Sequence, residues 1–171
     1  AGDFILKGTA GADVLIGRDG DDMLTGFASN DALRGGSGND RLTGGEGNDR
    51  LTGGTGNDII DGGEGNDLIF MRGANGIDAI DGGAGVDRLI AESDNSRFAF
   101  SAITGVENIS ADGHANVAIY GTSAADNFDF SATSLVGIVA INAGSGDDVI
   151  VGSAGADVIL GGGGLDTLSG G

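Results

Sequence analysis

The chain has 171 residues, with 26 acidic against eight basic side chains, a formal charge of −18, and 37 Gly but no Pro or Cys. This charge disfavours nucleic acid and anionic membranes as partners and favours cations. The lack of Cys excludes disulfides and thiolate metal sites, the lack of Pro excludes collagen, and no apolar stretch approaches the roughly 20 residues of a membrane span. We therefore expect no membrane insertion.

A nine-residue repeat begins at Gly8 and continues for seven units, from GTAGADVLI to GGEGNDLIF. Two more units follow Met71 and Arg72, and a further three cover residues 143–169. The sixth position is Asp and the eighth is Leu or Ile in every unit. An Asp that only formed turns would exchange with Asn, Ser or Gly, so the constant charge indicates a bound partner.

Each unit is predicted to form a turn followed by a short strand. Glycine permits positive φ in the turn, and the last three residues alternate so that the eighth position faces inward. One inward apolar residue in nine cannot be buried by a single unit, and so the units must stack.

Residues 35–70 match the pattern GGxGxDxUx at every defined position, where U is a bulky apolar residue. On these residues the chain resembles the RTX (repeat-in-toxin, haemolysin-type) calcium-binding family over 8–90 and 143–169. The resemblance implies an all-β fold, a right-handed parallel β-roll or β-solenoid in which each unit stacks on the unit two further on. It also implies several bound Ca²⁺ ions.

This pairing predicts two ladders of carboxylates, Asp13, Asp31, Asp49, Asp67 and Asp87 on one edge and Asp22, Asp40, Asp58 and Asp78 on the other. The expected metal ligands are completed by Asp148, Asp157 and Asp166, and by the turn residues Gly35, Gly36, Ser37, Gly38, Gly44, Gly45, Glu46, Gly47, Gly53, Gly54, Thr55 and Gly56. Strands stack about 4.8 Å apart, and calcium–oxygen bonds are about 2.3–2.6 Å long, so adjacent layers can share an ion. Without ions such carboxylates repel each other by roughly 3 kcal/mol per pair, which predicts folding on calcium binding.

Two places depart from the repeat. Phe27, Ala28 and Ser29 replace turn residues beside Asp31, and the insertion of Met71 and Arg72 lengthens the spacing from 18 to 20 residues, with Ala74 replacing a further turn glycine. Sites over 70–76 are expected to be distorted.

Residues 91–142 lose the period, although the runs RFAF, VENIS, NVAIY, NFDFS and GIVAIN predict strands. GTSAADNFD is a degenerate unit with Asp126 at its sixth position. We therefore divide the chain into a first RTX array (1–90), an irregular β-solenoid section (91–142) and a second array (143–171). The middle section, with four of the seven Phe, is either an aromatic-filled part of the same solenoid or a surface that binds sugar or protein.

No EF-hand or phosphate-binding loop is present, and His114 is expected to be a surface residue. With no catalytic residues or other cofactor predicted, we do not expect an enzyme. The predicted function is calcium binding by a secreted β-roll that folds and rigidifies on Ca²⁺, as a structural or self-assembling extracellular or surface-layer module. The resemblance implies type I secretion. Two alternatives are the accessory domain of a type I-secreted protease, lipase or alginate epimerase, and an adhesin or sugar-binding module.

Joined tail to head, the chain ends give GGAGDFILK, a near-repeat with Asp3 at position five. This favours either a segment cut from a longer array or head-to-tail stacking of subunits.

Overall fold

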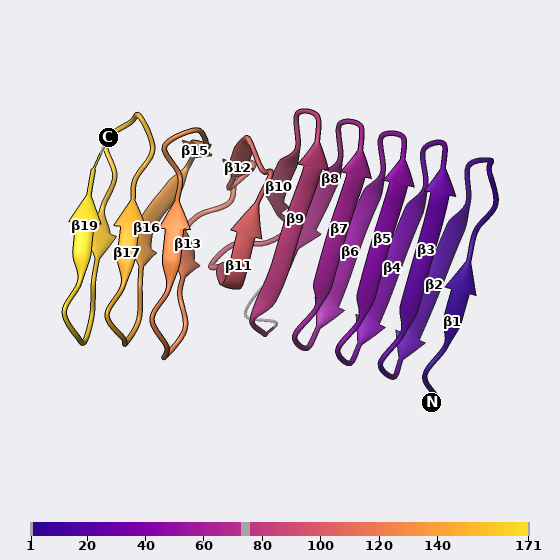
Figure 1. Cartoon of the computed structure of the whole chain (residues 1–171), viewed down its shortest axis with the longest axis horizontal. Helices are drawn as coiled ribbons and strands as arrows, with labels where there is room; N and C mark the ends of the chain where they lie inside the picture. The colour runs from indigo at the N-terminus through magenta and orange to yellow at the C-terminus, as the bar shows by residue number, and fades with distance from the viewer. Residues whose placement is uncertain (1, 73–75, 171) are drawn as a thin grey trace.

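The computed structural model describes residues 2–72 and 76–170 as an elongated stack of parallel β-strands (Figure 1). The strands are β1 Ile5–Lys7, β2 Val14–Asp19, β3 Met23–Ala28, β4 Ala32–Ser37, β5 Arg41–Glu46, β6 Arg50–Thr55, β7 Ile59–Glu64, β8 Leu68–Met71, β9 Asp78–Ala84, β10 Arg88–Ala91, β11 Arg97–Thr104, β12 Asn108–Ser110, β13 Val117–Tyr120, β14 Asn127–Asp129, β15 Ser134–Val136, β16 Ile138–Asn142, β17 Val149–Val151, β18 Ile159–Leu160 and β19 Thr167–Ser169. The described ranges contain no α-helix, and hence no helix that could cross a membrane.

Successive units alternate between two sheets that face each other, with the turns along the two long edges (Figure 1). One sheet has nine strands in the order β1-β3-β5-β7-β9-β11-β13-β16-β18, and the other has seven in the order β15-β12-β10-β8-β6-β4-β2. A third sheet has three strands in the order β14-β17-β19. Each unit therefore pairs with the unit two further on, for example Leu15 with Leu33 and Leu33 with Leu51. The predicted parallel β-solenoid is confirmed, with about nine turns.

The eighth position of the repeat forms the core between the two sheets. Leu24, Leu42 and Leu51 are fully buried, and Leu33 and Ile60 are each 2% exposed. The flanking seventh and ninth positions point outward, where Arg50 stacks on Phe70 with its guanidinium carbon 4.6 Å from the ring centroid. Burial of one Leu or Ile contributes about 1.5–3 kcal/mol, so a unit with one such residue adds little apolar stability.

An aromatic cluster replaces the single apolar row in the middle of the chain. Phe98, Phe100, Phe128 and Phe130 are at most 1% exposed, and consecutive ring centroids lie 6.0–6.4 Å apart. β11 pairs with β9 on one side and with β13 on the other, so the nine-stranded sheet continues through this section. These rings are core residues of the same solenoid.

The two-residue insertion is accommodated at the end of β8. Met71 is 6% exposed and extends the strand, pairing with Ala91 in β10. Residues 73–75, which include Ala74 and part of the region where we expected distorted sites, lie outside the described residues.

Candidate metal centre

The sixth-position aspartates stack in two ladders, one along each edge. In each ladder the backbone N–H of one Asp donates to Oδ1 of the Asp in the next layer. The first ladder runs Asp13, Asp31, Asp49, Asp67, Asp87, with N···O distances of 2.7–2.8 Å. The second runs Asp22, Asp40, Asp58, Asp78, with distances of 2.8–2.9 Å. The predicted pairing is therefore correct, and both ladders cross the insertion without a break.

The ladders extend past the regular repeats. The Asp87 N–H donates to Oε2 of Glu107 at 2.7 Å, so a glutamate takes the next place in the first ladder. At the other end the Phe4 N–H donates to Oδ1 of Asp22. A third ladder joins three residues near the C-terminus, Asp126, Asp148 and Asp166. Sequence inspection missed Glu107 because both the residue type and the local period change there.

The second carboxylate oxygen, Oδ2, has no hydrogen-bond partner in eight of these aspartates. The eight are Asp22, Asp31, Asp40, Asp49, Asp58, Asp67, Asp87 and Asp148. All of them are at most 2% exposed. Burying an ionised carboxylate without a partner costs several kcal/mol, so each of these oxygens requires a cation or a proton.

In regular units of the first array, the first glycine leaves the space beside this oxygen open. A Cβ on Gly26 would overlap Oδ2 of Asp31 and would lie 2.6 Å from the carbonyl oxygen of Gly44 in the next layer. Gly44 has the same relation to Asp49, and Gly35 and Gly53 lie likewise against the aspartates of their own units. Carboxylate and carbonyl oxygens therefore converge at a point that any side chain would fill.

The second and fourth positions shape the turn. Gly36, Gly38, Gly54 and Gly56 have φ of 116–131°, and Gly45 and Gly47 repeat this pattern with φ of 117° and 128°. A Cβ on any of them would collide with the backbone of the neighbouring turn.

The third position contributes its backbone to the stack. The carbonyls of Ser37 and Thr55 accept hydrogen bonds from the N–H groups of Gly20 and Gly38. The side chains of Ser37, Glu46 and Thr55 are exposed.

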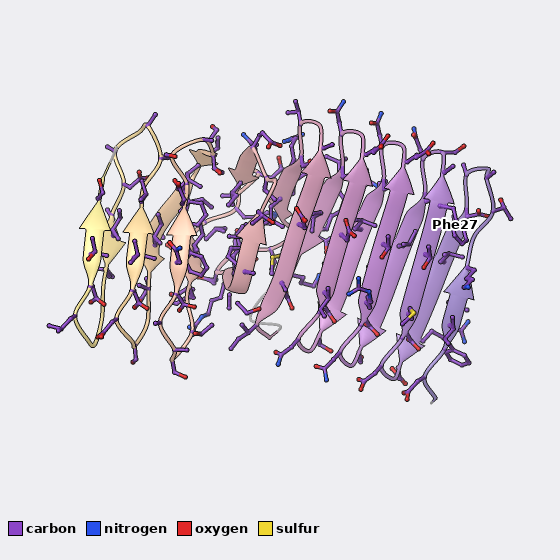
Figure 2. The ribbon with its side chains drawn as sticks, viewed as in Figure 1. Phe27 is labelled. Carbon is purple, nitrogen blue, oxygen red and sulfur yellow. The ribbon has the colours of Figure 1, made fainter. Side chains whose placement is uncertain are left out.

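Non-glycine residues hold the same turn shape where the repeat departs from its pattern. Arg18, Phe27 and Ser29 have φ of 92°, 83° and 73°, in a region that is strained for side chains other than glycine. Phe27 (Figure 2) is 47% exposed. Because Oδ2 of Asp31 still lacks a partner, this turn keeps the geometry of its glycine-rich neighbours.

Burial raises the pKa of six of the ladder carboxylates above the ordinary value of 3.8. Burial raises the pKa of Asp58 to about 7, against the lowering effect of the hydrogen bond from the Asp40 N–H, and the charges of Asp78 and Asp40 raise it further. Burial likewise raises the pKa of Asp78 and that of Asp87 to about 6. The pKa values of Asp40, Asp49 and Asp67 are also raised, mainly by burial.

These donors fit a hard divalent cation. Ca²⁺ prefers carboxylate and carbonyl oxygens, and both kinds meet beside Gly26 and Gly44. Within residues 2–72 and 76–170, no three His, Cys, Asp or Glu side chains gather as a metal-binding group. An ion would therefore be held by ladder carboxylates together with backbone carbonyls of the turns, and would neutralise the unpartnered oxygens.

Comparison with known families agrees with this geometry. The family model for the RTX calcium-binding nonapeptide repeat matches four times, at residues 7–42, 34–69, 70–97 and 142–171, which is more than half of the chain. The chain belongs to the RTX family. RTX repeats typically bind Ca²⁺ and are typical of type I-secreted proteins. No curated protein matches the chain significantly.

The RTX matches leave residues 98–141 uncovered, and His114 lies in this section. Its Nδ1 is 3.2 Å from Oδ1 of Asp94, which also accepts the N–H of Ala115. These two contacts lower the pKa of Asp94, the backbone hydrogen bond contributing most. The pair connects two loops 20 residues apart.

Proposed function

We propose that this RTX module is a structural element that works outside the cell, where Ca²⁺ folds the solenoid and makes it rigid. We propose further that it has no catalytic activity of its own. The observation that carries the proposal is the row of eight buried carboxylate oxygens without a partner. As anions they oppose folding, and with Ca²⁺ they become ligands.

The balance of energies supports a calcium requirement. Each regular unit buries one Leu or Ile, worth about 1.5–3 kcal/mol, and orders several glycines, each of which loses about 0.4–1 kcal/mol more than Ala in chain entropy. A buried anionic carboxylate with one oxygen unpartnered and no counter-charge adds a further cost of several kcal/mol. The regular units therefore lack the stability to fold at neutral pH unless ligation supplies it.

Secretion fits this requirement. A module that stays unfolded where Ca²⁺ is scarce and folds where it is abundant can pass a secretion channel as an open chain. The structural role is supported by the solenoid itself, because parallel sheets stacked layer on layer resist bending when every layer is joined to the next by ladder hydrogen bonds.

Far-ultraviolet circular dichroism and small-angle scattering test the proposal. At pH 8 with EGTA we expect an expanded ion-binding array and only a weak β signal from the aromatic section, and with millimolar Ca²⁺ an elongated rigid particle. Asp49→Asn keeps the Oδ1 acceptor and removes the charge, and should raise the Ca²⁺ concentration needed for folding. Asp19→Asn, which removes an exposed charge outside the ladders, is the matched control. An intact solenoid in EGTA at pH 8 would contradict the proposal.

Sedimentation velocity with and without Ca²⁺ reports whether the folded module also associates with itself. Concentration-dependent growth in Ca²⁺ is the result that a self-assembling surface role requires. A strictly monomeric folded form would restrict the module to a structural part of a larger protein, including an accessory domain of a secreted enzyme.

A further inference from the structure

In three sixth-position aspartates the Oδ2 oxygen accepts hydrogen bonds, and the units of these three share one sequence feature. In Asp13, Oδ2 accepts the Thr9 N–H at 2.6 Å and the Thr9 hydroxyl at 2.9 Å. The Thr9 Oγ1 in turn accepts the Gly11 N–H at 3.1 Å. The hydroxyl of the second position thus closes a small hydrogen-bonded ring over the carboxylate.

The same ring occurs twice more. In the degenerate unit, Oδ2 of Asp126 accepts the Thr122 N–H at 2.6 Å and its hydroxyl at 3.1 Å. In the second array, Oδ2 of Asp157 accepts the Ser153 N–H at 2.7 Å and its hydroxyl at 3.0 Å. In both turns the fourth-position N–H donates to the same hydroxyl oxygen. These are the three units with Thr or Ser at position two.

The backbone φ angles at the second and fourth positions also distinguish the turns with a hydroxyl at position two from the turns with an unpartnered Oδ2. Turns with an unpartnered Oδ2 have positive φ at the second and fourth positions, even where these are Phe27 and Ser29. In the three turns with a hydroxyl, neither position has positive φ, although Gly11 and Gly155 stand at the fourth. The turn type therefore follows the hydroxyl at position two and not the glycine content.

We propose that a Thr or Ser at position two replaces calcium in its turn, so that Asp13, Asp126 and Asp157 do not bind the ion. The inference rests on the proposed calcium function and divides the ladder into ion-binding and self-capped turns. In a capped turn, the oxygen that an ion would take already receives an N–H and an O–H, and the backbone around it has a different shape. The sequence pattern alone places Asp13 and Asp157 among the metal ligands, whereas the hydrogen bonds assign them to caps.

One of the capped turns lies in a part of the chain where the array is irregular. Thr122 and Asp126 lie in the stretch that the family model leaves uncovered. Asp126 also starts the third ladder by donating its N–H to Asp148, whose Oδ2 is unpartnered. A capped layer without an ion thus precedes a layer that requires one.

Calcium stoichiometry, measured by isothermal titration calorimetry on the full chain, tests the assignment. Asp157→Asn and Asp13→Asn are expected to leave the number of bound ions unchanged, whereas Asp49→Asn should lower it. Ser153→Gly should raise the number by one, because it removes the cap and permits positive φ, and Ser153→Thr should not change it. Circular dichroism in Ca²⁺ verifies that each variant folds.

The outcomes separate the two proposals. If Asp157→Asn and Asp13→Asn lower the stoichiometry as much as Asp49→Asn does, capping is refuted while calcium binding stands. If the wild-type chain binds no Ca²⁺, the proposed function fails and the capping inference fails with it. Should Ser153→Gly not fold, the Asp→Asn comparison alone still decides.

Discussion

Lowering the pH is expected to stabilise the ion-free solenoid, because protons can neutralise the buried carboxylates in place of calcium. Burial raises the pKa of Asp58 to about 7 and the pKa values of Asp78 and Asp87 to about 6 in the ion-free fold. Each lies above the ordinary value of 3.8 that the unfolded chain retains. The folded state therefore binds more protons, and the stability that protonation gives is complete below about pH 4 and is lost as the pH rises through about 6 to 7.

The size of the effect follows from these values. Raising a carboxyl pKa from 3.8 to about 7 costs the ionised fold about 4 kcal/mol. Lowering the pH from about 8 to about 5 goes two pH units below the pKa of Asp58 and recovers about 3 kcal/mol, and Asp78 and Asp87 recover about 1.4 kcal/mol each. Because Asp58 and Asp78 interact, part of this gain is shared. A total of about 3–5 kcal/mol is comparable to the stability of a small domain.

The assay is circular dichroism of resin-stripped protein without added calcium, because EGTA loses its affinity for Ca²⁺ in acid. The β signal should be weak near pH 8 and grow toward pH 5, which stays above the sequence pI of about 4.1. Asp58→Asn should flatten this dependence, and Asp19→Asn should preserve it. A stripped chain that is equally unfolded at both pH values, or better folded at pH 8, would refute the reasoning.

The remaining predictions concern calcium-loaded protein in urea and its response to chelation. Leu51→Ala should destabilise the fold by about 2–5 kcal/mol, because Leu51 is fully buried, while Thr52→Ala on the outer face should cost far less. Gly54→Ala should destabilise by more than 1 kcal/mol, because φ is 123° and its Cβ would meet the Gly36 backbone; Gly170→Ala, which meets nothing within 4 Å, is the neutral control. When Ca²⁺ is chelated near pH 8, hydrogen exchange of backbone amides should become faster first in β2–β10. An equally early loss of protection in β11–β13 would contradict this prediction.

The RTX resemblance predicted the sheet pairing, and the nine-residue period predicted which residues meet in it. The period puts one apolar side chain and one carboxylate in every unit, so that stacking alternate units places Leu33 against Leu51 and Asp31 against Asp49. The insertion at Met71 did not disturb this order, because the strand absorbed it.

What the sequence did not reveal are contacts that depend on a single hydrogen bond. Two outer ladders join fifth-position residues, with the N–H of Asn57 donating to Asn39 in one and that of Asn66 to Asn48 in the other, and the repeated GND was their visible signal. Asp3 belongs to the ladder of Asn39 and Asn57, since its Oδ1 accepts the Asp21 N–H and Asp21 in turn accepts the Asn39 N–H. Its place at position five, which looked like a misfit, is in phase.

The source of stability changes along the solenoid. Seven of the eight unpartnered oxygens belong to aspartates between Asp22 and Asp87, where each layer buries little beyond Leu or Ile. Beyond Asp87 the ladder passes to Glu107, and four packed Phe rings take over the core. Layers that bury a Phe gain more apolar area than a Leu provides, and the Thr122 cap removes the anionic cost there. We therefore expect folding to require calcium where the core is thinnest, and we expect the aromatic section to stay folded in the ion-free chain.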